Sequence, residues 1–130
     1  MSYIGVIIEE SLANKEVLND LKILKTKVEK VTPKHNTPHI NQWTMDTVEI
    51  EEDKAQVIAE KISQSLDASH GNWYADFKDD NFHYIIFKDK IFKVNRGNKA
   101  EYDKVTKYGV SFGIPDYQLD FSPDIKEWER

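Results

Sequence analysis

The order of apolar and amphipathic segments constrains the fold of this chain more than any other feature. Residues Tyr3–Ile8 form a nearly continuous apolar run, which predicts a central strand covered on both faces. The next segments alternate between helical and strand-like periodicity. They are a short helix at Asn14–Leu21, strands at Lys22–Val31 and Gln42–Ile50, a helix opened by Asp53 and an apolar strand at Trp73–Phe77.

This order predicts an α+β fold with a ferredoxin-like βαββαβ core, in which an antiparallel sheet carries its helices on one face. Strands at His83–Phe87 and Ile91–Val94, joined by a tight turn at Lys88-Asp89-Lys90, and a third helix beginning at Asn98 extend the core. We expect one domain over residues 1–122 and a frayed tail over 123–130. Since this fold hosts many activities, function has to be argued from a site.

Local signals define several details of these elements. Asp53 with Gln56, and Asn98 with Glu101, have the spacing of capping boxes, and Gly109 predicts the end of the third helix. Gly5 predicts that a helix approaches the first strand closely. The second helix has an apolar face at helical spacing, formed by Ala55, Ile58, Ala59, Ile62 and Leu66.

Lysines define the strand at Lys22–Val31. Leu24, Thr26 and Val28 alternate with charged side chains along it. Because charge on an edge strand discourages pairing with another chain, this composition predicts a position at the edge of the sheet.

Composition narrows the class of protein. The chain has 18 basic and 23 acidic residues in 130, a net charge of −5, so a nucleic-acid partner is not expected. Cysteine is absent, which excludes cysteine nucleophiles, iron–sulfur clusters and cysteine-based zinc sites. The sequence has neither a basic leader nor a run of about 18 apolar residues. We therefore expect a cytoplasmic protein without a membrane partner.

Asp76 and His83 are the polar pair with the clearest chemical interest. Asp76 lies between Ala75 and Phe77 in an apolar run, and a buried carboxylate requires a partner. His83 is a candidate partner, and a carboxylate beside a histidine is the minimal acid–base pair. The nearby acids Asp79 and Asp80 are predicted to form a turn instead.

Aromatic side chains are concentrated in the middle of the chain, and such a group usually fills a core or an interface. The group is Trp43, Trp73, Tyr74, Phe77, Phe82, Tyr84, Phe87 and Phe92. Four of its members, which lie near predicted strand ends or on strands, are candidate ligand-binding residues: Trp43, Trp73, Tyr74 and Tyr84.

Two histidines, His35 and His39, have a spacing that zinc accepts on a helix. Pro33 and Pro38 make a helix improbable there, so the segment is predicted to be a loop with solvated histidines. They are weak metal-ligand candidates, and we expect neither a metal nor a cofactor.

Several segments resemble a family of small, uncharacterised bacterial and archaeal single-domain proteins with no assigned activity. They are Gly5-Val6-Ile7-Ile8-Glu9-Glu10-Ser11-Leu12, Gln42-Trp43-Thr44, Trp73-Tyr74-Ala75-Asp76-Phe77, His83-Tyr84-Ile85-Ile86-Phe87 and Gly113-Ile114-Pro115. The resemblance implies a single cytosolic domain and supplies no site residues.

With no catalytic signature in the sequence, we expect a binding or interaction module for a small-molecule or protein partner, with a homodimer through the sheet face as one arrangement. The first alternative is a small enzyme that uses Asp76 and His83 as an acid–base pair on a small substrate. The second is an RNA-binding domain that uses the aromatic residues and the ridge of lysines at Lys22–Lys30.

Overall fold

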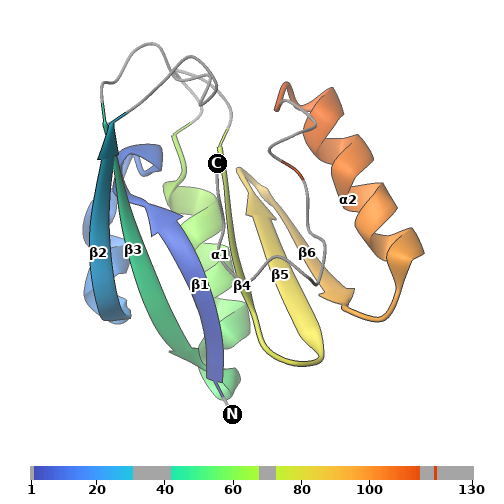
Figure 1. Ribbon diagram of the computed structural model, residues 1–130, viewed down its shortest axis with the longest axis horizontal. Helices are drawn as coiled ribbons and strands as arrows, with labels where there is room; N and C mark the ends of the chain where they lie inside the picture. The colour runs from blue at the N-terminus through green and yellow to red at the C-terminus, as the bar shows by residue number, and fades with distance from the viewer. Residues whose placement is uncertain (1, 31–41, 68–72, 115–118, 120–130) are drawn as a thin grey trace.

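Six strands form a single antiparallel sheet in the computed structural model, which describes residues 2–30, 42–67, 73–114 and 119. The strand order is β2-β3-β1-β4-β5-β6 (Figure 1). The strands are β1 (Ser2–Ile8), β2 (Lys22–Lys30), β3 (Gln42–Glu51), β4 (Tyr74–Lys78), β5 (Phe82–Phe87) and β6 (Lys90–Asn95). The helical elements are the 3-10 turns η1 (Glu9–Ser11), η2 (Lys15–Asp20) and η4 (Glu52–Lys54), and the helices α1 (Ala55–Ser65) and α2 (Lys99–Ser111).

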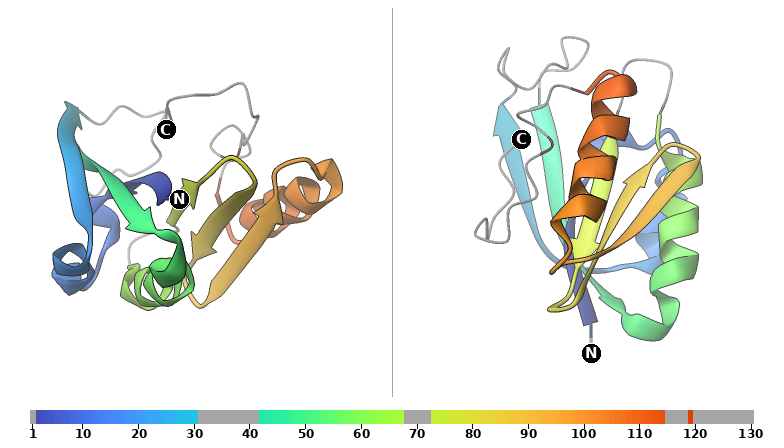
Figure 2. Two further views of the ribbon diagram at one scale, coloured as in Figure 1. Left: turned by 90° about the horizontal axis from the view of Figure 1, so that it is seen from below. Right: turned by 90° about the vertical axis from the view of Figure 1, so that its right-hand side faces the viewer.

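The two α-helices lie on opposite faces of the sheet (Figures 1 and 2). The predicted α+β class is confirmed, and the prediction of helices on one face fits η2 and α1, which contact each other. It does not fit α2. The second face needs its own cover because β5 and β6 turn apolar side chains toward it, among them Phe87 and Val94, which pack with Val105 of α2.

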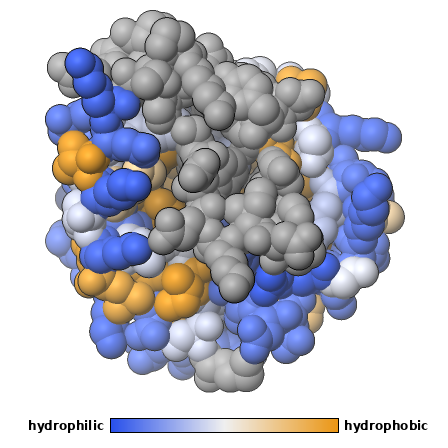
Figure 3. All heavy atoms as spheres, in the orientation of Figure 1, coloured by the Kyte–Doolittle hydropathy of each residue, from blue (hydrophilic) through white to orange (hydrophobic). Residues whose placement is uncertain are grey.

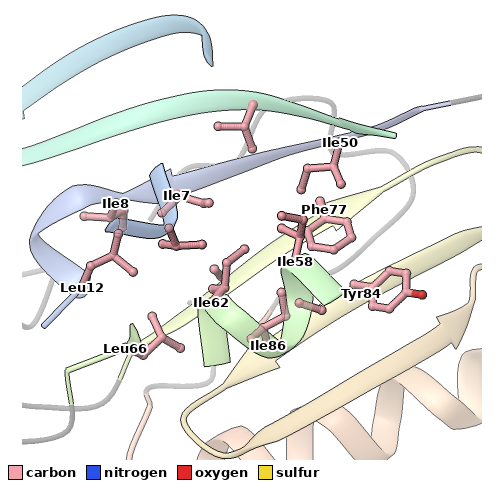
Figure 4. Packing of buried hydrophobic residues seen from close by; sticks show 14 of the residues in the cluster. Ile7, Ile8, Leu12, Ile50, Ile58, Ile62, Leu66, Phe77, Tyr84 and Ile86 are labelled. Carbon is pink, nitrogen blue, oxygen red and sulfur yellow. The ribbon is translucent and has the colours of Figure 1, made fainter. Parts of the chain in front are cut away.

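The main core lies between α1 and the sheet. Ile58 and Ile62 of α1 point toward Ile50, Phe77 and Ile86 on the strands (Figure 4). The predicted apolar face of this helix is confirmed, since all five of its members are buried. The sequence therefore places α1 correctly against the sheet, and burial of this face supplies the main hydrophobic stabilisation of this layer.

Strand β2 lies at one end of the sheet, so the prediction of an edge strand is confirmed. Its pairing with β3 shifts register between Ile23 and Lys25, which leaves Leu24 in a bulge. Strand β1 lies between β3 and β4, as its apolar composition predicts.

The start of α1 differs from the prediction. Asp53 falls in the turn η4, the residue before the helix is Lys54, and no side chain caps the helix. The capping box at Asp53 and Gln56 is therefore wrong. The turn η4 leads directly into α1, so its backbone occupies the position where a capping side chain would act.

Only one of the two hydrogen bonds of the capping box predicted at the start of α2 is formed. Asn98 accepts a hydrogen bond from the Glu101 backbone N–H at 3.3 Å. The Glu101 carboxylate accepts from the backbone N–H of Asn95 at 3.1 Å instead of from Asn98. It thereby joins the end of β6 to the helix.

The end of α2 corrects the prediction made from Gly109. That glycine lies within the helix and is buried against the side chain of Leu119. The chain leaves the helix at Gly113, which has a φ of 103°. Gly113 N–H donates to Val110 and Ile114 N–H donates to Gly109, both at 3.0 Å, as in a Schellman motif.

Gly5 permits a close approach of strand β4 and not of a helix. A Cβ added at Gly5 would lie against the Asp76 carbonyl oxygen and 2.5 Å from Cβ of Phe77. At the β5–β6 turn, Asp89 supplies the positive φ, 61°, that a glycine would usually provide.

The segment Asn14–Leu21 forms the 3-10 turn η2 with Asn14 as its cap, and Val17 is its buried residue, whereas Leu18 and Leu21 are half-buried. Among the described residues, no helix combines the length and apolar character that crossing a membrane requires.

Candidate functional site

Asp76 is buried on the sheet face opposite to that covered by α1. It lies on β4 opposite Val6 of β1 and Ile85 of β5. Since both of these neighbours are aliphatic, the carboxylate depends on a polar partner within the layer for its stability.

His83 supplies that partner. Its Nε2 lies 2.7 Å from Oδ2 of Asp76, and the two side chains are 2% and 5% exposed. On the sheet, His83 is opposite Lys78, so Asp76 and His83 are diagonal neighbours on one face. The structure brings the predicted polar pair into direct contact.

Tyr102 of α2 is the hydrogen-bond partner of the other ring nitrogen of His83. Its hydroxyl lies 3.2 Å from Nδ1, and the two rings meet edge to face at 5.8 Å. A carboxylate accepts hydrogen bonds only, so Nε2 of His83 carries a proton toward Asp76. In the neutral imidazole, Nδ1 then accepts the hydroxyl proton of Tyr102.

Two cationic side chains, Lys78 and Arg96, lie near the contacts that join Asp76, His83 and Tyr102. Burial lowers the pKa of Lys78, an effect that the Asp76 charge opposes and the Arg96 charge reinforces. Burial also raises the pKa of Tyr102, although Arg96 lowers it in part. Tyr102 therefore stays a neutral phenol near pH 7 and can donate to His83.

The arrangement fixes the position of α2 on the sheet more readily than it performs acid–base catalysis. Both nitrogens of His83 have partners within the protein, and the ring is almost fully buried. A substrate would reach the imidazole only after Tyr102 had moved. Tyr102 is the partly exposed member of this chain of contacts, and its raised pKa keeps the phenol protonated near pH 7, so that little phenolate is present to act as a base.

The turn predicted at Asp79-Asp80-Asn81 is confirmed. Oδ1 of Asp79 accepts hydrogen bonds from the backbone N–H groups of Asn81 and Phe82, at 2.8 and 2.7 Å. Arg96 donates to the Asp79 carbonyl oxygen at 2.5 Å, which holds its guanidinium at this end of the sheet.

A second buried acid, Asp46, was not predicted as a site. It lies on β3 opposite Ile7 and is fully buried. Its Oδ1 accepts a hydrogen bond from Oγ1 of Thr26 at 2.6 Å, whereas Oδ2 is buried and accepts no N–H or hydroxyl hydrogen bond from the described residues. The sequence signal was available, because Asp46 is in phase with the inward-facing residues Val48 and Ile50.

Glu9 of η1 is the neighbour that completes this second site. A hydrogen bond to Asp46, followed by burial and the Asp46 charge, raises the pKa of Glu9 to about 7, while Lys15 acts in the opposite direction. Protonated Glu9 thus supplies a donor to Asp46. The adjacent Glu10 accepts from Thr44, from N–H at 2.5 Å and from Oγ1 at 2.7 Å.

The four aromatic ligand-binding candidates, Trp43, Trp73, Tyr74 and Tyr84, are all buried. The Trp43 and Trp73 rings lie 5.7 Å apart, and Tyr84 stacks on Phe77 at 4.8 Å. In this arrangement their faces contact other residues of the chain. A binding role for them stays a prediction.

His35 and His39, the weak metal-ligand candidates, lie outside the described residues. Within the described part of the chain, no group of three or more His, Asp or Glu side chains is arranged to hold a metal ion.

Comparison with protein-family models, with curated proteins and with solved structures finds no match to this chain. The resemblance to a family of small bacterial and archaeal proteins therefore stays a prediction, and function has to be argued from the chain itself.

Proposed function

We propose that this protein is a binding module that acts through the open edge of its sheet at β2. The partner adds an extended segment beside this strand and forms backbone hydrogen bonds with it. This mode of recognition uses the row of N–H and C=O groups that any edge strand presents.

The observation that carries the proposal is a concentration of exposed apolar side chains on one edge strand. Six large hydrophobic residues among those described are exposed, and three of them lie on β2: Ile23 at 43%, Leu24 at 47% and Val28 at 58%. A strand protected only against aggregation needs its lysines but gains nothing from exposed aliphatic groups. Figure 3 shows apolar groups between hydrophilic ones over this side of the sheet.

The test is to select peptides that bind the full chain and locate their binding site. Random nine-residue peptides, the length of β2, would be displayed and selected, and then added to isotope-labelled protein for amide NMR. We expect shift changes and new protection from hydrogen exchange along β2. Selection of no peptide, or shifts confined to other elements, would overturn the proposal.

A matched pair of variants sharpens this test. Val28→Asn removes an exposed apolar side chain from β2, whereas Val57→Asn removes one of similar exposure, 53%, from α1. Binding should weaken about tenfold in the first variant and stay unchanged in the second, a difference of about 1.4 kcal/mol. Equal affinities would contradict a site at β2.

A second candidate function is acid–base chemistry or small-anion binding around Asp76 and His83. The observation that favours it is the position of the partly buried Lys78, which lies opposite His83 with Arg96 nearby, so that two cationic side chains adjoin the pair. Titration of the protein with acetate and with inorganic phosphate tests it. Amide shifts at Lys78, Arg96 and Tyr102 without shifts in β2 would favour this candidate over the first.

The sheet order β2-β3-β1-β4, with every neighbouring pair antiparallel, supports a ferredoxin-like arrangement of the first four strands. The absence of cysteine is compatible with a cytoplasmic location.

A homodimer through the sheet face is an alternative outcome, which sedimentation would reveal. The buried aromatic rings give little support to RNA binding by base stacking.

A further inference from the structure

Building on the proposed function, we propose that the segment recognised by β2 belongs to another protein and alternates acidic with apolar side chains. The two faces of β2 differ in chemistry, and a strand added beside it continues both faces. The side chains of the partner must therefore match each face in turn.

One face of β2 is cationic. Register with β3 places Lys25 opposite Thr47 and Lys27 opposite Met45, and Lys22 is opposite Glu49 on the same face. Lys22 also forms an ion pair with Glu49 at 3.3 Å. This face carries three lysines and a single acid, Glu29, so acidic side chains on a neighbouring strand would meet opposite charge.

The other face of β2 carries two aliphatic side chains, Ile23 and Val28, with Thr26 between them and Lys30 at its end. Thr26 and Val28 lie opposite Asp46 and Thr44, and Ile23 lies opposite Val48. The Thr26 hydroxyl is already used by Asp46 at 2.6 Å. Among these side chains, Ile23 and Val28 are exposed, and aliphatic side chains of a partner strand would bury part of both.

A second copy of this chain fits the edge poorly. When two β2 strands pair antiparallel around Thr26, each Lys25 lies opposite a Lys27. Like charges directly opposite one another destabilise such a pair. The lysines thus disfavour self-association while remaining complementary to an acidic strand.

The regular part of β2 sets the extent of the contact. Beyond the shift between Ile23 and Lys25, the register with β3 is continuous from Lys25 to Lys30. Leu24, in the bulge, adds a further exposed aliphatic side chain to this part of the strand. The docking surface is therefore Ile23–Lys30.

The experiment uses three nine-residue peptides on the full chain, at the length of β2. The first alternates glutamate with valine, the second replaces each glutamate by lysine, and the third contains the glutamates and valines in separate blocks. Fluorescence anisotropy measures affinity at two salt concentrations. The first peptide should bind at least about tenfold more tightly than either of the others, and salt should weaken it.

Charge-reversal variants provide matched controls. Lys25→Glu/Lys27→Glu should weaken the alternating acidic peptide by about tenfold or more and strengthen the lysine peptide. Lys104→Glu/Lys107→Glu makes the same change in net charge on exposed positions of α2 and should leave both affinities unchanged. Equal loss in the two variants would show an effect of net charge and overturn the inference.

The outcomes separate this inference from the function on which it rests. If the lysine peptide or the block peptide binds β2 as tightly as the alternating acidic one, the stated partner chemistry is wrong and strand addition stands. If none of the peptides protects the β2 amides and selected peptides also map elsewhere, both proposals fail. Binding of poly-uridine to β2 in place of the acidic peptide, or cross-linking of β2 to β2 in solution, would also overturn the inference.

Discussion

Two aspartates are buried on opposite faces of one sheet, and they are stabilised in different ways. Asp76 is 4% exposed and Asp46 is fully buried. Asp76 lies opposite Val6 and Asp46 opposite Ile7, consecutive residues of β1 whose side chains point to opposite faces. Asp76 has an imidazole N–H as its partner, whereas Asp46 has a hydroxyl and a second carboxyl group, that of Glu9.

The stability of a buried carboxylate depends on the group that donates a hydrogen bond to it. The donor of Asp76 is a ring nitrogen that carries a proton whether the imidazole is neutral or charged. Part of the donation to Asp46 comes from Glu9, which supplies a proton only below its raised pKa. The donor of Asp76 is thus present in both forms of the imidazole, whereas the hydrogen bond from Glu9 to Asp46 changes with pH near neutrality.

The largest effect is expected at Gly5, because β1 joins the two sites. Gly5→Ala would force a Cβ against the Asp76 carbonyl oxygen and the Phe77 backbone, neither of which can move without displacing β4. We expect a loss of about 3 to 4 kcal/mol in the free energy of unfolding, measured in urea. Gly97→Ala, whose Cβ would meet its nearest atom at 3.4 Å, is the control and should cost less than about 1 kcal/mol.

The next effect isolates the pair Asp76–His83. His83→Ala leaves the Asp76 carboxylate buried without its imidazole donor and should cost about 3 kcal/mol of stability. In a double-mutant cycle with Asp76→Ala, the coupling energy should be about 2 kcal/mol, from urea unfolding of all four proteins.

An exposed ion pair provides the control for that cycle. Lys61 and Asp20 are 3.0 Å apart and about half exposed, so their coupling energy should stay below about 0.5 kcal/mol. A coupling at Asp76–His83 no larger than this would mean that the pair is not what stabilises the site.

Asp76 and His83 could be paired from sequence because one physical rule applies directly. A carboxylate within an apolar strand needs a donor, and His83 lies on the next strand at a spacing that a hairpin brings together. Tyr102 could not be added, since its contact depends on which face α2 covers. That face follows from the three-dimensional apolar surface of β4–β6 and not from local periodicity.

Tyr102→Phe removes the hydroxyl that meets Nδ1 of His83 and keeps the ring in place. We expect a loss of about 1 to 1.5 kcal/mol, because a buried nitrogen loses its partner. Tyr108→Phe is the matched control on the same helix, where Tyr108 packs on the Phe87 ring, and it should cost less than about 0.5 kcal/mol. Equal losses in calorimetric or urea unfolding would contradict a special role for the Tyr102 hydroxyl.

The central position of β1, the edge position of β2 and the apolar face of α1 could be predicted because each depends on local composition. Glu9 and Asp46 are far apart in sequence and meet only through the β1–β3 register and the turn of η1. The sequence shows Asp46 as an acid among other acids of β3. Its burial can be predicted only if its alternation with the inward-facing Val48 and Ile50 is given more weight than the charge of its neighbours.

The smallest effect is the pH dependence that Glu9 contributes. Its pKa is raised from 4.5 to about 7 in the folded protein, so between these values the folded state binds more protons than the unfolded state. Stability from this group is therefore fully present below pH 4.5 and is lost as pH rises through about 7. We expect a loss of about 1 kcal/mol across that window, less than the full shift implies because Glu9 is partly exposed.

Glu9→Gln tests this argument, since its amide N–H can donate to Asp46 at every pH. Urea unfolding at several pH values should show a smaller fall in stability between pH 4.5 and 7 than in the unchanged chain. Glu16→Gln, an exposed change on η2, should leave the slope unaltered. If the Glu9 variant retains the full slope, the proton lost near pH 7 does not come from this carboxyl pair, and the contrast between the two aspartates would have to rest on their hydrogen-bond partners alone.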